Sequence, residues 1–126
     1  MKVLILETTK DRAKLIQDLL TNYRYKIQVA IEGENVINKI REEKPALIIL
    51  NANLRPFSGI GILEKIKSDP RYKKIPVILI SNFDSSEMAN KVKEYPNVDL
   101  LKEPFKIKNF RHMVERWINF RSLYVN

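Results

Sequence analysis

Cysteine is absent from the 126 residues of this chain. Its absence excludes thiol catalysis, zinc sites built on thiolates and structural disulfides, and it is compatible with a reducing cytoplasm. Apolar runs long enough to span a bilayer are also absent, and the opening MKVLILE reaches a charged residue within seven positions. We therefore expect a cytoplasmic protein with no secretory signal and no membrane partner.

Glycine and histidine are scarce, with 3 glycines and 1 histidine in the chain. Gly59 and Gly61 do not form a phosphate-binding loop, because the Lys-Ser/Thr pair that such a loop requires does not follow them. His112 stands beside Arg111 and has no second group that would orient it for catalysis. We expect a solvated or partly packed His112, no catalytic residues and no enzymatic turnover.

Acidic residues are outnumbered: 23 Lys and Arg face 15 Asp and Glu, which gives a net charge of +8. Such an excess is compatible with a nucleic-acid or acidic protein partner, or simply with a solvated surface of mixed charge. No helix-turn-helix and no aromatic RNA-binding motif is visible, so only the net charge favours a nucleic-acid partner. The basic residues are locally concentrated only near the carboxyl terminus, at Lys106, Lys108, Arg111, Arg116 and Arg121.

Strand-like and helix-like segments alternate along the chain, which predicts a (βα)5 domain. The expected strands are 2–7, 26–31, 46–51, 75–81 and 98–101. The expected helices run from Thr8 or Thr9 to about Asn22, over 34–43, from Ser58, from a capping box at Asp84, and over 106–120. The uninterrupted apolar run ALIILN at 46–51 is typical of a central parallel strand.

This alternation predicts the α/β class, with a doubly wound parallel five-stranded sheet and helices on both faces. One domain over 1–122 accounts for it, and residues 123–126 are a frayed tail or the start of a linker. Sites in such sheets form beyond the carboxyl ends of the strands. Four polar positions follow strand ends here, namely Glu7-Thr8, Asn51, Ser81 and Glu103.

Several segments, in their order and spacing, resemble the receiver domain of response regulators, the phospho-acceptor module of two-component signalling. These segments are VLILETT, YKIQVAIEGENVINKI, PALIILNANLRPFSGIGIL, IPVILIS and DLLKEPF. The resemblance covers essentially the whole chain. It implies the flavodoxin-like, CheY-like sheet with strand order 2-1-3-4-5.

The resemblance also implies a chemistry. In that family an Asp at the end of the third strand attacks the phosphoryl group of a partner's phosphohistidine. Two acidic residues after the first strand help to hold Mg2+, which prefers anionic oxygen ligands. A Ser or Thr after the fourth strand and a Lys after the fifth contact the phosphoryl oxygens. The nucleophile has to be a carboxylate oxygen.

This sequence departs from that pattern at the acceptor itself, because the position falls on Asn51. A neutral amide oxygen cannot form a stable acyl phosphate. Read alone, Asn51 is a strand-end residue that hydrogen-bonds the loop after it. The acidic pair becomes Glu7-Thr8, with one carboxylate at most, while Ser81 keeps the hydroxyl group.

The lysine position, counted back from Pro104, falls on Glu103, and Lys102 lies one residue earlier. A shift of one residue places Lys102 on the opposite face of the strand, unless a β-bulge restores it. The carboxylates of Glu7 and Glu103 would repel each other unless Arg55, Lys102 or water intervenes. The resemblance further implies a cis peptide bond before Pro104.

The sequence thus predicts a degenerate phospho-acceptor pocket with no cofactor and with weak or absent Mg2+ binding. A phosphorylation-independent pseudo-receiver that acts as a protein-interaction module follows. The first alternative is an unconventional receiver that still binds Mg2+ and phosphoryl groups and uses another acceptor, such as Asp84. The second, less favoured, is a basic nucleic-acid-binding domain.

The family commonly uses the surface of the fourth helix, fifth strand and fifth helix for partners and dimers. An aromatic residue on the fifth strand belongs to its switch, and that position is Leu100 here. The residues expected on this face are Met88, Lys91, Tyr95, Leu100, Lys102, Lys106 and Arg111. Their basic character suits an acidic protein partner, such as a histidine kinase or an output protein, with a homodimer as the alternative.

Overall fold

The computed structural model describes the backbone of every residue except 22, 32–34, 55–57, 83–85 and 126, and leaves the side chains of Glu87 and residues 120–125 undescribed. Strands and helices alternate along the chain. In chain order the elements are β1 (Lys2–Leu6), α1 (Lys10–Leu19), β2 (Lys26–Ala30), α2 (Val36–Glu43), β3 (Leu47–Asn51), α3 (Gly59–Ser68), β4 (Val77–Ser81), α4 (Ser86–Val92), β5 (Val98–Lys102) and α5 (Ile107–Val125).

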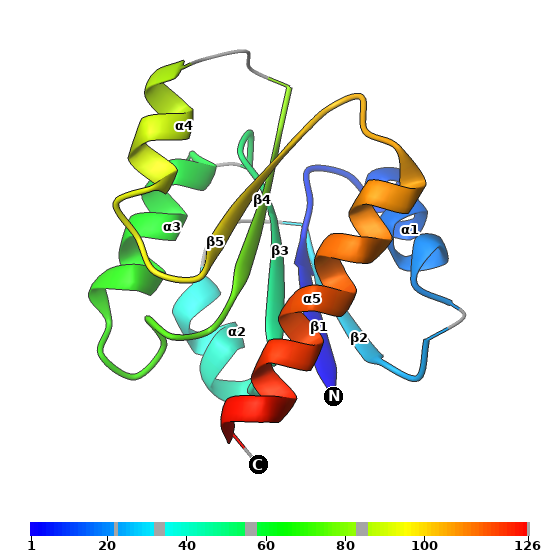
Figure 1. Cartoon of the computed structure of the whole chain (residues 1–126), viewed down its shortest axis with the longest axis horizontal. Coiled ribbons are helices and arrows are strands. Elements are labelled where there is room, and N and C mark those ends of the chain that lie inside the picture. Colours follow the sequence, from blue (N-terminus) through cyan, green and yellow to red (C-terminus); the bar gives the residue numbers. More distant parts are fainter. Residues whose placement is uncertain (22, 32–34, 55–57, 83–85, 126) are drawn as a thin grey trace.

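The strands form one five-stranded sheet in the order β2-β1-β3-β4-β5 (Figure 1). All of its paired strands run parallel, from the β1–β2 pair at one edge to the β4–β5 pair at the other. This confirms the predicted α/β class and the strand order. Because all five strands run in the same direction, their carboxyl ends lie along the same end of the sheet. The polar residues that follow the strands are therefore brought together.

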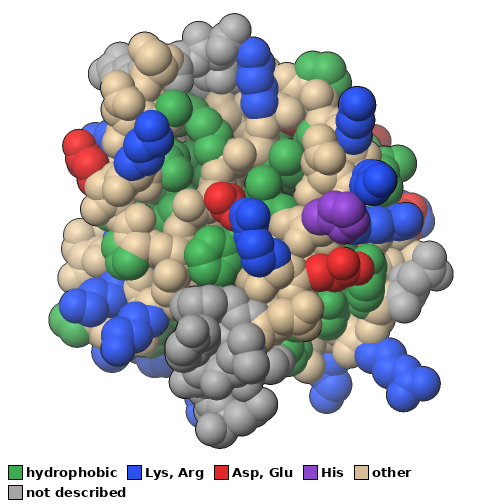
Figure 2. Space-filling model, viewed as in Figure 1, with side chains coloured by type: hydrophobic (Ala, Val, Ile, Leu, Met, Phe, Trp, Pro, Cys, Tyr) green, Lys and Arg blue, Asp and Glu red, His purple; other side chains and the backbone are tan. Residues whose placement is uncertain are grey.

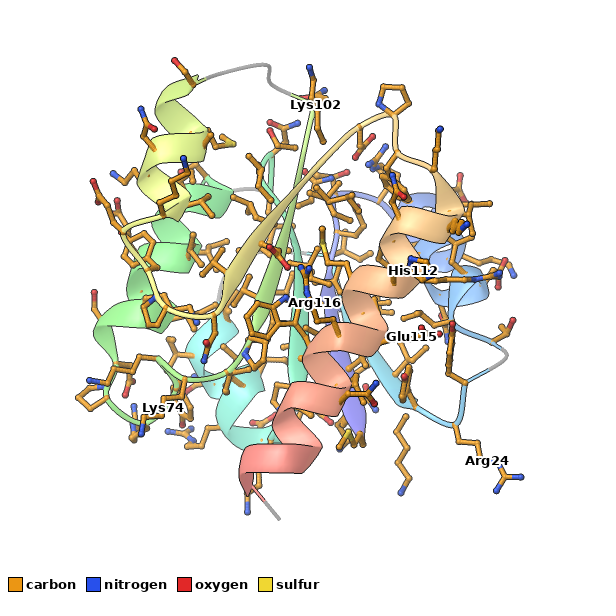
Figure 3. The ribbon with its side chains drawn as sticks, viewed as in Figure 1. Arg24, Lys74, Lys102, His112, Glu115 and Arg116 are labelled. Carbon is orange, nitrogen blue, oxygen red and sulfur yellow. The ribbon has the colours of Figure 1, made fainter. Side chains whose placement is uncertain are left out.

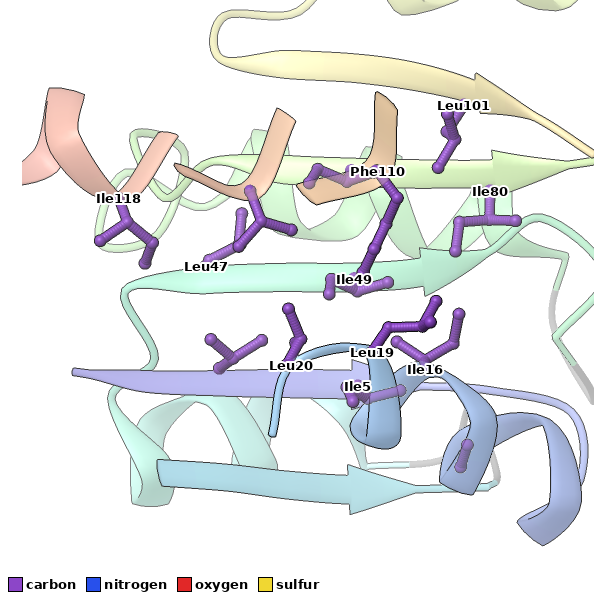
Figure 4. Close-up of a cluster of buried hydrophobic side chains, with 14 of the residues drawn as sticks. Ile5, Ile16, Leu19, Leu20, Leu47, Ile49, Ile80, Leu101, Phe110 and Ile118 are labelled. Carbon is purple, nitrogen blue, oxygen red and sulfur yellow. The ribbon is translucent and has the colours of Figure 1, made fainter. Parts of the chain in front are cut away.

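Two apolar clusters lie on opposite faces of the sheet. One joins β-strand side chains to α1 and α5 through Ile16, Phe110 and Val114, and Figure 4 shows it in close-up. The other lies beneath α2, α3 and α4 and includes Ile40 and Leu63. The central strand β3 is buried over its whole length, as its uninterrupted apolar run predicts.

Local sequence signals for helix starts are largely confirmed. The Thr9 hydroxyl accepts a hydrogen bond from the backbone N–H of Arg12, and the Ser58 hydroxyl accepts one from Gly61. The capping box expected at Asp84 lies outside the described residues. The fifth helix does not end near residue 120 as expected, because α5 continues to Val125.

The end of α1 was also predicted wrongly, because the helix stops at Leu19 rather than near residue 22. The next backbone N–H groups make tighter bonds, from Leu20 to the Gln17 carbonyl at 3.0 Å and from Thr21 to the Asp18 carbonyl at 3.3 Å. Such bonds close the last turn of a helix and end it.

The charged surface is mixed. Lys and Arg side chains are spread over several elements on the face shown in Figure 2. His112 is exposed on α5, as expected (Figure 3). Within the part of the chain that is described, no helix is both long and apolar enough to cross a membrane.

One lysine is buried. Lys67 lies at the end of α3 with 7% of its surface exposed. Its Nζ donates hydrogen bonds to the carbonyl oxygens of Lys73 at 2.9 Å and Ile75 at 2.7 Å, which ties α3 to the segment before β4. Burial lowers the pKa of Lys67 from 10.5 to about 8.

This burial predicts a pH-dependent stability. Between pH 8 and 10.5 the unfolded chain binds more protons at Lys67 than the folded chain, so the free energy of unfolding rises with pH across this window. Relative to Lys67→Met, we expect the wild type to gain about 2 kcal/mol between pH 7 and pH 10. Urea unfolding at both pH values measures it. Exposed Lys74→Met is the matched control, and an equal pH dependence in the two variants would contradict the prediction.

Candidate functional site

The site is built around the carboxylate of Glu7, which follows β1 and is 1% exposed. Its Oε1 accepts hydrogen bonds from the backbone N–H of Thr8 at 2.7 Å and from the Thr8 hydroxyl at 3.1 Å. The backbone of Glu7 is held as well, because its N–H donates to the Ala30 carbonyl at 3.1 Å. A buried carboxylate needs such donors, since burial without them is costly. Thr8 therefore supports Glu7 instead of supplying a second anion.

Asn51 ends β3 and faces Glu7. Its Nδ2 donates to Glu7 Oε1 at 2.9 Å and to Glu7 Oε2 at 3.1 Å, while its Oδ1 accepts from the backbone N–H of Asn53 at 2.7 Å. A carboxylate only accepts and a backbone N–H only donates, so these partners determine which way the amide points. Asn51 thus contacts Glu7 and also hydrogen-bonds the following loop, so the two interpretations of this residue do not exclude each other.

A cation enters this pocket from α1. Arg12 Nε lies 3.1 Å from Glu7 Oε1, and Arg12 Nη2 forms an ion pair with the carboxylate of Glu103. Burial lowers the pKa of Arg12, but hydrogen bonds and charge attraction from Glu7 and Glu103 outweigh this and raise it above its ordinary value. The sequence reasoning missed Arg12, and Arg55, one of the groups expected to intervene, lies outside the described residues.

A signal for Arg12 was present in the sequence. It is three residues beyond the capping Thr9, in the first turn of α1. Side chains there point back toward the start of the helix, and the start of α1 adjoins the end of β1. An arginine in that turn can therefore reach a carboxylate that follows β1.

Ser81 and Glu103 lie at the carboxyl ends of the neighbouring strands β4 and β5. Ser81 ends β4 and is 1% exposed, and its carbonyl oxygen accepts a hydrogen bond from the backbone N–H of Glu103 at 2.7 Å. The peptide bond between Glu103 and Pro104 is cis, which confirms the expectation. Asp84, the alternative acceptor considered above, lies outside the described residues.

Lys102 is not restored by a β-bulge. The β4–β5 register runs without interruption from Val77 opposite Val98 to Ser81 opposite Lys102. The Lys102 side chain is exposed at the end of β5 (Figure 3), whereas Leu101 before it is buried. The position at which the family has its lysine is therefore occupied by Glu103, which pairs with Arg12.

Mg2+ does not fit the residues as they stand. Glu7 Oε1 already has contacts from Thr8, Arg12 and Asn51, and the Asn51 carbonyl oxygen is used by Asn53. Within the described residues, no group of three or more Asp, Glu, His or Cys side chains is placed to hold a metal ion. A divalent ion here would have to displace a guanidinium group and break the Asn51–Glu7 hydrogen bonds.

Comparison with protein families identifies the family to which this chain belongs. The family model of the response regulator receiver domain matches residues 3–115, which is most of the chain. The chain belongs to the response regulator receiver domain family. It is thus a receiver domain of the two-component signalling type, and the resemblance seen in its sequence is confirmed.

Curated relatives of this receiver domain differ widely in length. The probable chemotaxis protein CheY of Rhizobium etli is 26% identical over 116 residues, covering 91% of this chain and 90% of that protein. Hybrid signal transduction histidine kinase D of Dictyostelium discoideum is 26% identical, covering 96% of this chain but 8% of that protein. The two-component response regulator-like APRR3 of Arabidopsis thaliana is 27% identical, covering 90% of this chain and 23% of that protein.

Solved receiver domains share the fold. That of a putative Luxo repressor protein from Vibrio parahaemolyticus has a TM-score of 0.86 at 24% identity, covering 97% of this chain and 92% of the other. That of sensor histidine kinase PA1611 from Pseudomonas aeruginosa has a TM-score of 0.80 at 18% identity, covering 94% and 97%. The second structure holds a magnesium ion in its active site cleft.

The residues predicted for the interaction face of this receiver domain differ in their burial and in their contacts. Met88, Tyr95 and Leu100 are partly buried and pack against the cluster beneath α2, α3 and α4. Lys106 is exposed, while Lys91 Nζ pairs with Glu64 Oε1 on α3 at 2.6 Å.

Arg111 was placed on this face wrongly. Its Nε donates to the Leu19 carbonyl at 3.2 Å, so Arg111 lies on the side of α5 that faces α1. The sequence reasoning also missed how β5 is joined to α5. Trp117 Nε1 donates to Asp99 Oδ2 at 2.7 Å, and Arg116 pairs with the same carboxylate (Figure 3).

Proposed function

We propose that this receiver domain is a protein-interaction module that works without being phosphorylated and has no turnover of its own. The observation that carries the proposal is the pair of hydrogen bonds from Asn51 Nδ2 to the two carboxylate oxygens of Glu7. The residue at the acceptor position is thus a donor engaged inside the pocket. An acceptor of a phosphoryl group has to present a free anionic oxygen.

Both ends of the Asn51 amide are occupied. An attack by its carbonyl oxygen would break the hydrogen bond from the Asn53 N–H, 2.7 Å away, and would start from a neutral and weakly nucleophilic atom. The arrangement is also self-consistent, because an aspartate at this position would set two carboxylates against each other. Asn51 therefore stabilises the pocket that Glu7 needs.

The proposed partner is an acidic protein surface, on a histidine kinase or an output protein, that binds the face of α4, β5 and α5. Receiver domains interact with both classes. The support is that Met88, Tyr95 and Leu100 are partly buried, while Lys102 and Lys106, at the end of β5 and just before α5, are exposed. A homodimer through this face is the alternative, and the proposed location is the cytoplasm.

An NMR titration tests the proposal. We expect the amide spectrum of the labelled domain to show no saturable shifts at Asn51, Ser81 and Glu103 when Mg2+ and beryllofluoride, a mimic of the phosphoryl group, are added together. A receiver domain with an aspartate acceptor, treated identically, is the positive control. Saturable shifts at these residues that spread to β5 and α5 would overturn the proposal, as would shifts centred on Asp84.

A further inference from the structure

Arg12 occupies a particular place in this pocket. Its planar guanidinium group contacts the buried carboxylate of Glu7 through Nε, at 3.1 Å, and the carboxylate of Glu103 through Nη2. The Arg12 side chain is 40% exposed and the Glu7 side chain 1%, so the positive charge lies on the solvent side of the buried carboxylate. Glu7 and Glu103 lie far apart in the sequence, after the first and the last strand.

We propose that the Arg12 guanidinium is the resident cation of this pocket, held between Glu7 and Glu103 in place of a divalent ion, and that it holds the turn after β5 against α1 in one arrangement. This inference rests on the proposed function and names what keeps the pocket in a single state.

The charges support this assignment. Two carboxylates at one site repel each other and together attract a cation. An arginine presents donors in a rigid planar fork that can address two carboxylates at once, which a lysine ammonium group cannot do with the same geometry. Because Arg12 is covalently part of α1, its local concentration does not depend on the ions in solution. Arg12 therefore compensates one of the two negative charges whatever ions are in solution.

The ion pair between Arg12 and Glu103 lies next to the segment that leads into α5. Glu103 is followed by Pro104 and Phe105, and the Phe105 ring lies 5.6 Å from the Phe110 ring, between centroids. Phe110 is fully buried in α5. A fixed Glu103 carboxylate thus fixes the start of α5 relative to β5. If the cation could bind and leave, the turn after β5 would adopt one arrangement with the cation bound and another without it.

Paramagnetic broadening by Mn2+ tests the inference. In the wild type we expect the amides of Glu7, Asn51 and Glu103 to be broadened no more than those near exposed carboxylates. In Arg12→Gln the two carboxylates lose their cation, and we expect Mn2+ to bind there at least about tenfold more tightly, as removal of a unit charge about 4 Å away predicts. Arg12→Gln with Glu103→Gln should lose this binding again.

Lys10→Gln is the matched control, because it removes one positive charge from the same end of α1 at an exposed position. It should behave as the wild type does, whereas Arg12→Gln alone should shift the amides of residues 103–107 before any metal is added. If Arg12→Gln does not fold, Arg12→Lys replaces it, with the same shifts expected because a single ammonium group cannot hold both carboxylates.

Three results would overturn the inference: Mn2+ binding in the wild type as tight as in Arg12→Gln, no increase in that variant, or shifts confined to α1. None of these bears on the beryllofluoride titration of the wild type. If that titration is positive while Arg12→Gln behaves as expected, the proposed function fails and the role of Arg12 stands.

Discussion

Asn51→Asp is expected to lower the free energy of unfolding by about 3 kcal/mol at pH 7, because it places a second carboxylate against Glu7 in a buried site. Two hydrogen bonds of 2.9 and 3.1 Å to the Glu7 oxygens are replaced by repulsion between oxygens. Arg12 cannot offset this fully, since it already shares its charge between Glu7 and Glu103. The aspartate that the family uses is therefore predicted to be unfavourable in this chain.

The pH dependence gives this prediction a distinctive sign. Repulsion from Glu7 raises the pKa of the introduced carboxyl group in the folded state above its value in the unfolded chain, about 4. Between these two pKa values the folded state binds more protons than the unfolded chain. The loss of stability is therefore complete above the raised pKa and disappears as the pH falls below about 4.

Urea unfolding of both proteins at pH 7 and pH 4, followed by circular dichroism, measures this effect. The matched control is Asn109→Asp, which introduces the same charge at an exposed position of α5 and should stay within about 0.5 kcal/mol of the wild type. A variant at Asn51 as stable as this control at pH 7 would show that the Asn51–Glu7 hydrogen bonds do not hold the pocket together.

Gly59→Ala is expected to lower the free energy of unfolding by about 3 kcal/mol, because the added methyl group has no room. A Cβ at Gly59 would lie 2.4 Å from the Ala52 Cα and 2.5 Å from the Asn51 carbonyl oxygen. Both are backbone atoms, so no side chain can rotate away. The Gly59 N–H also donates to the Ala52 carbonyl at 2.9 Å, which holds the start of α3 against the end of β3.

Gly61→Ala provides the control two residues along the same helix. A Cβ there would lie 3.4 Å from the Ser58 hydroxyl oxygen, an ordinary contact, so we expect no loss of stability or a gain of up to about 1 kcal/mol. Urea unfolding separates the two variants. Equal stability of the two would mean that α3 shifts freely, and the amide of Asn51 should report such a shift by NMR.

Much of the fold followed from local patterns in the sequence. Apolar runs such as ALIILN and the Thr9 and Ser58 caps depend on neighbouring residues alone, so they predicted the alternation of strands and helices. Parallel strands with short crossovers then place all carboxyl ends at one edge, which predicted that Glu7 and Asn51 meet. Element ends were less well predicted, as α1 and α5 show, because a final turn depends on what the chain packs against.

The sequence by itself determined the class of the domain, its family and the loss of an aspartate at position 51. Only the tertiary structure decided how the altered pocket is satisfied. Arg12 meets Glu103 across 91 positions of sequence, and Trp117 meets Asp99 across 18. Long charged side chains have many rotamers, and which carboxylate they reach depends on the spacing of elements that no local pattern describes. The cation in the pocket therefore becomes visible only when α1 and the turn after β5 are placed side by side.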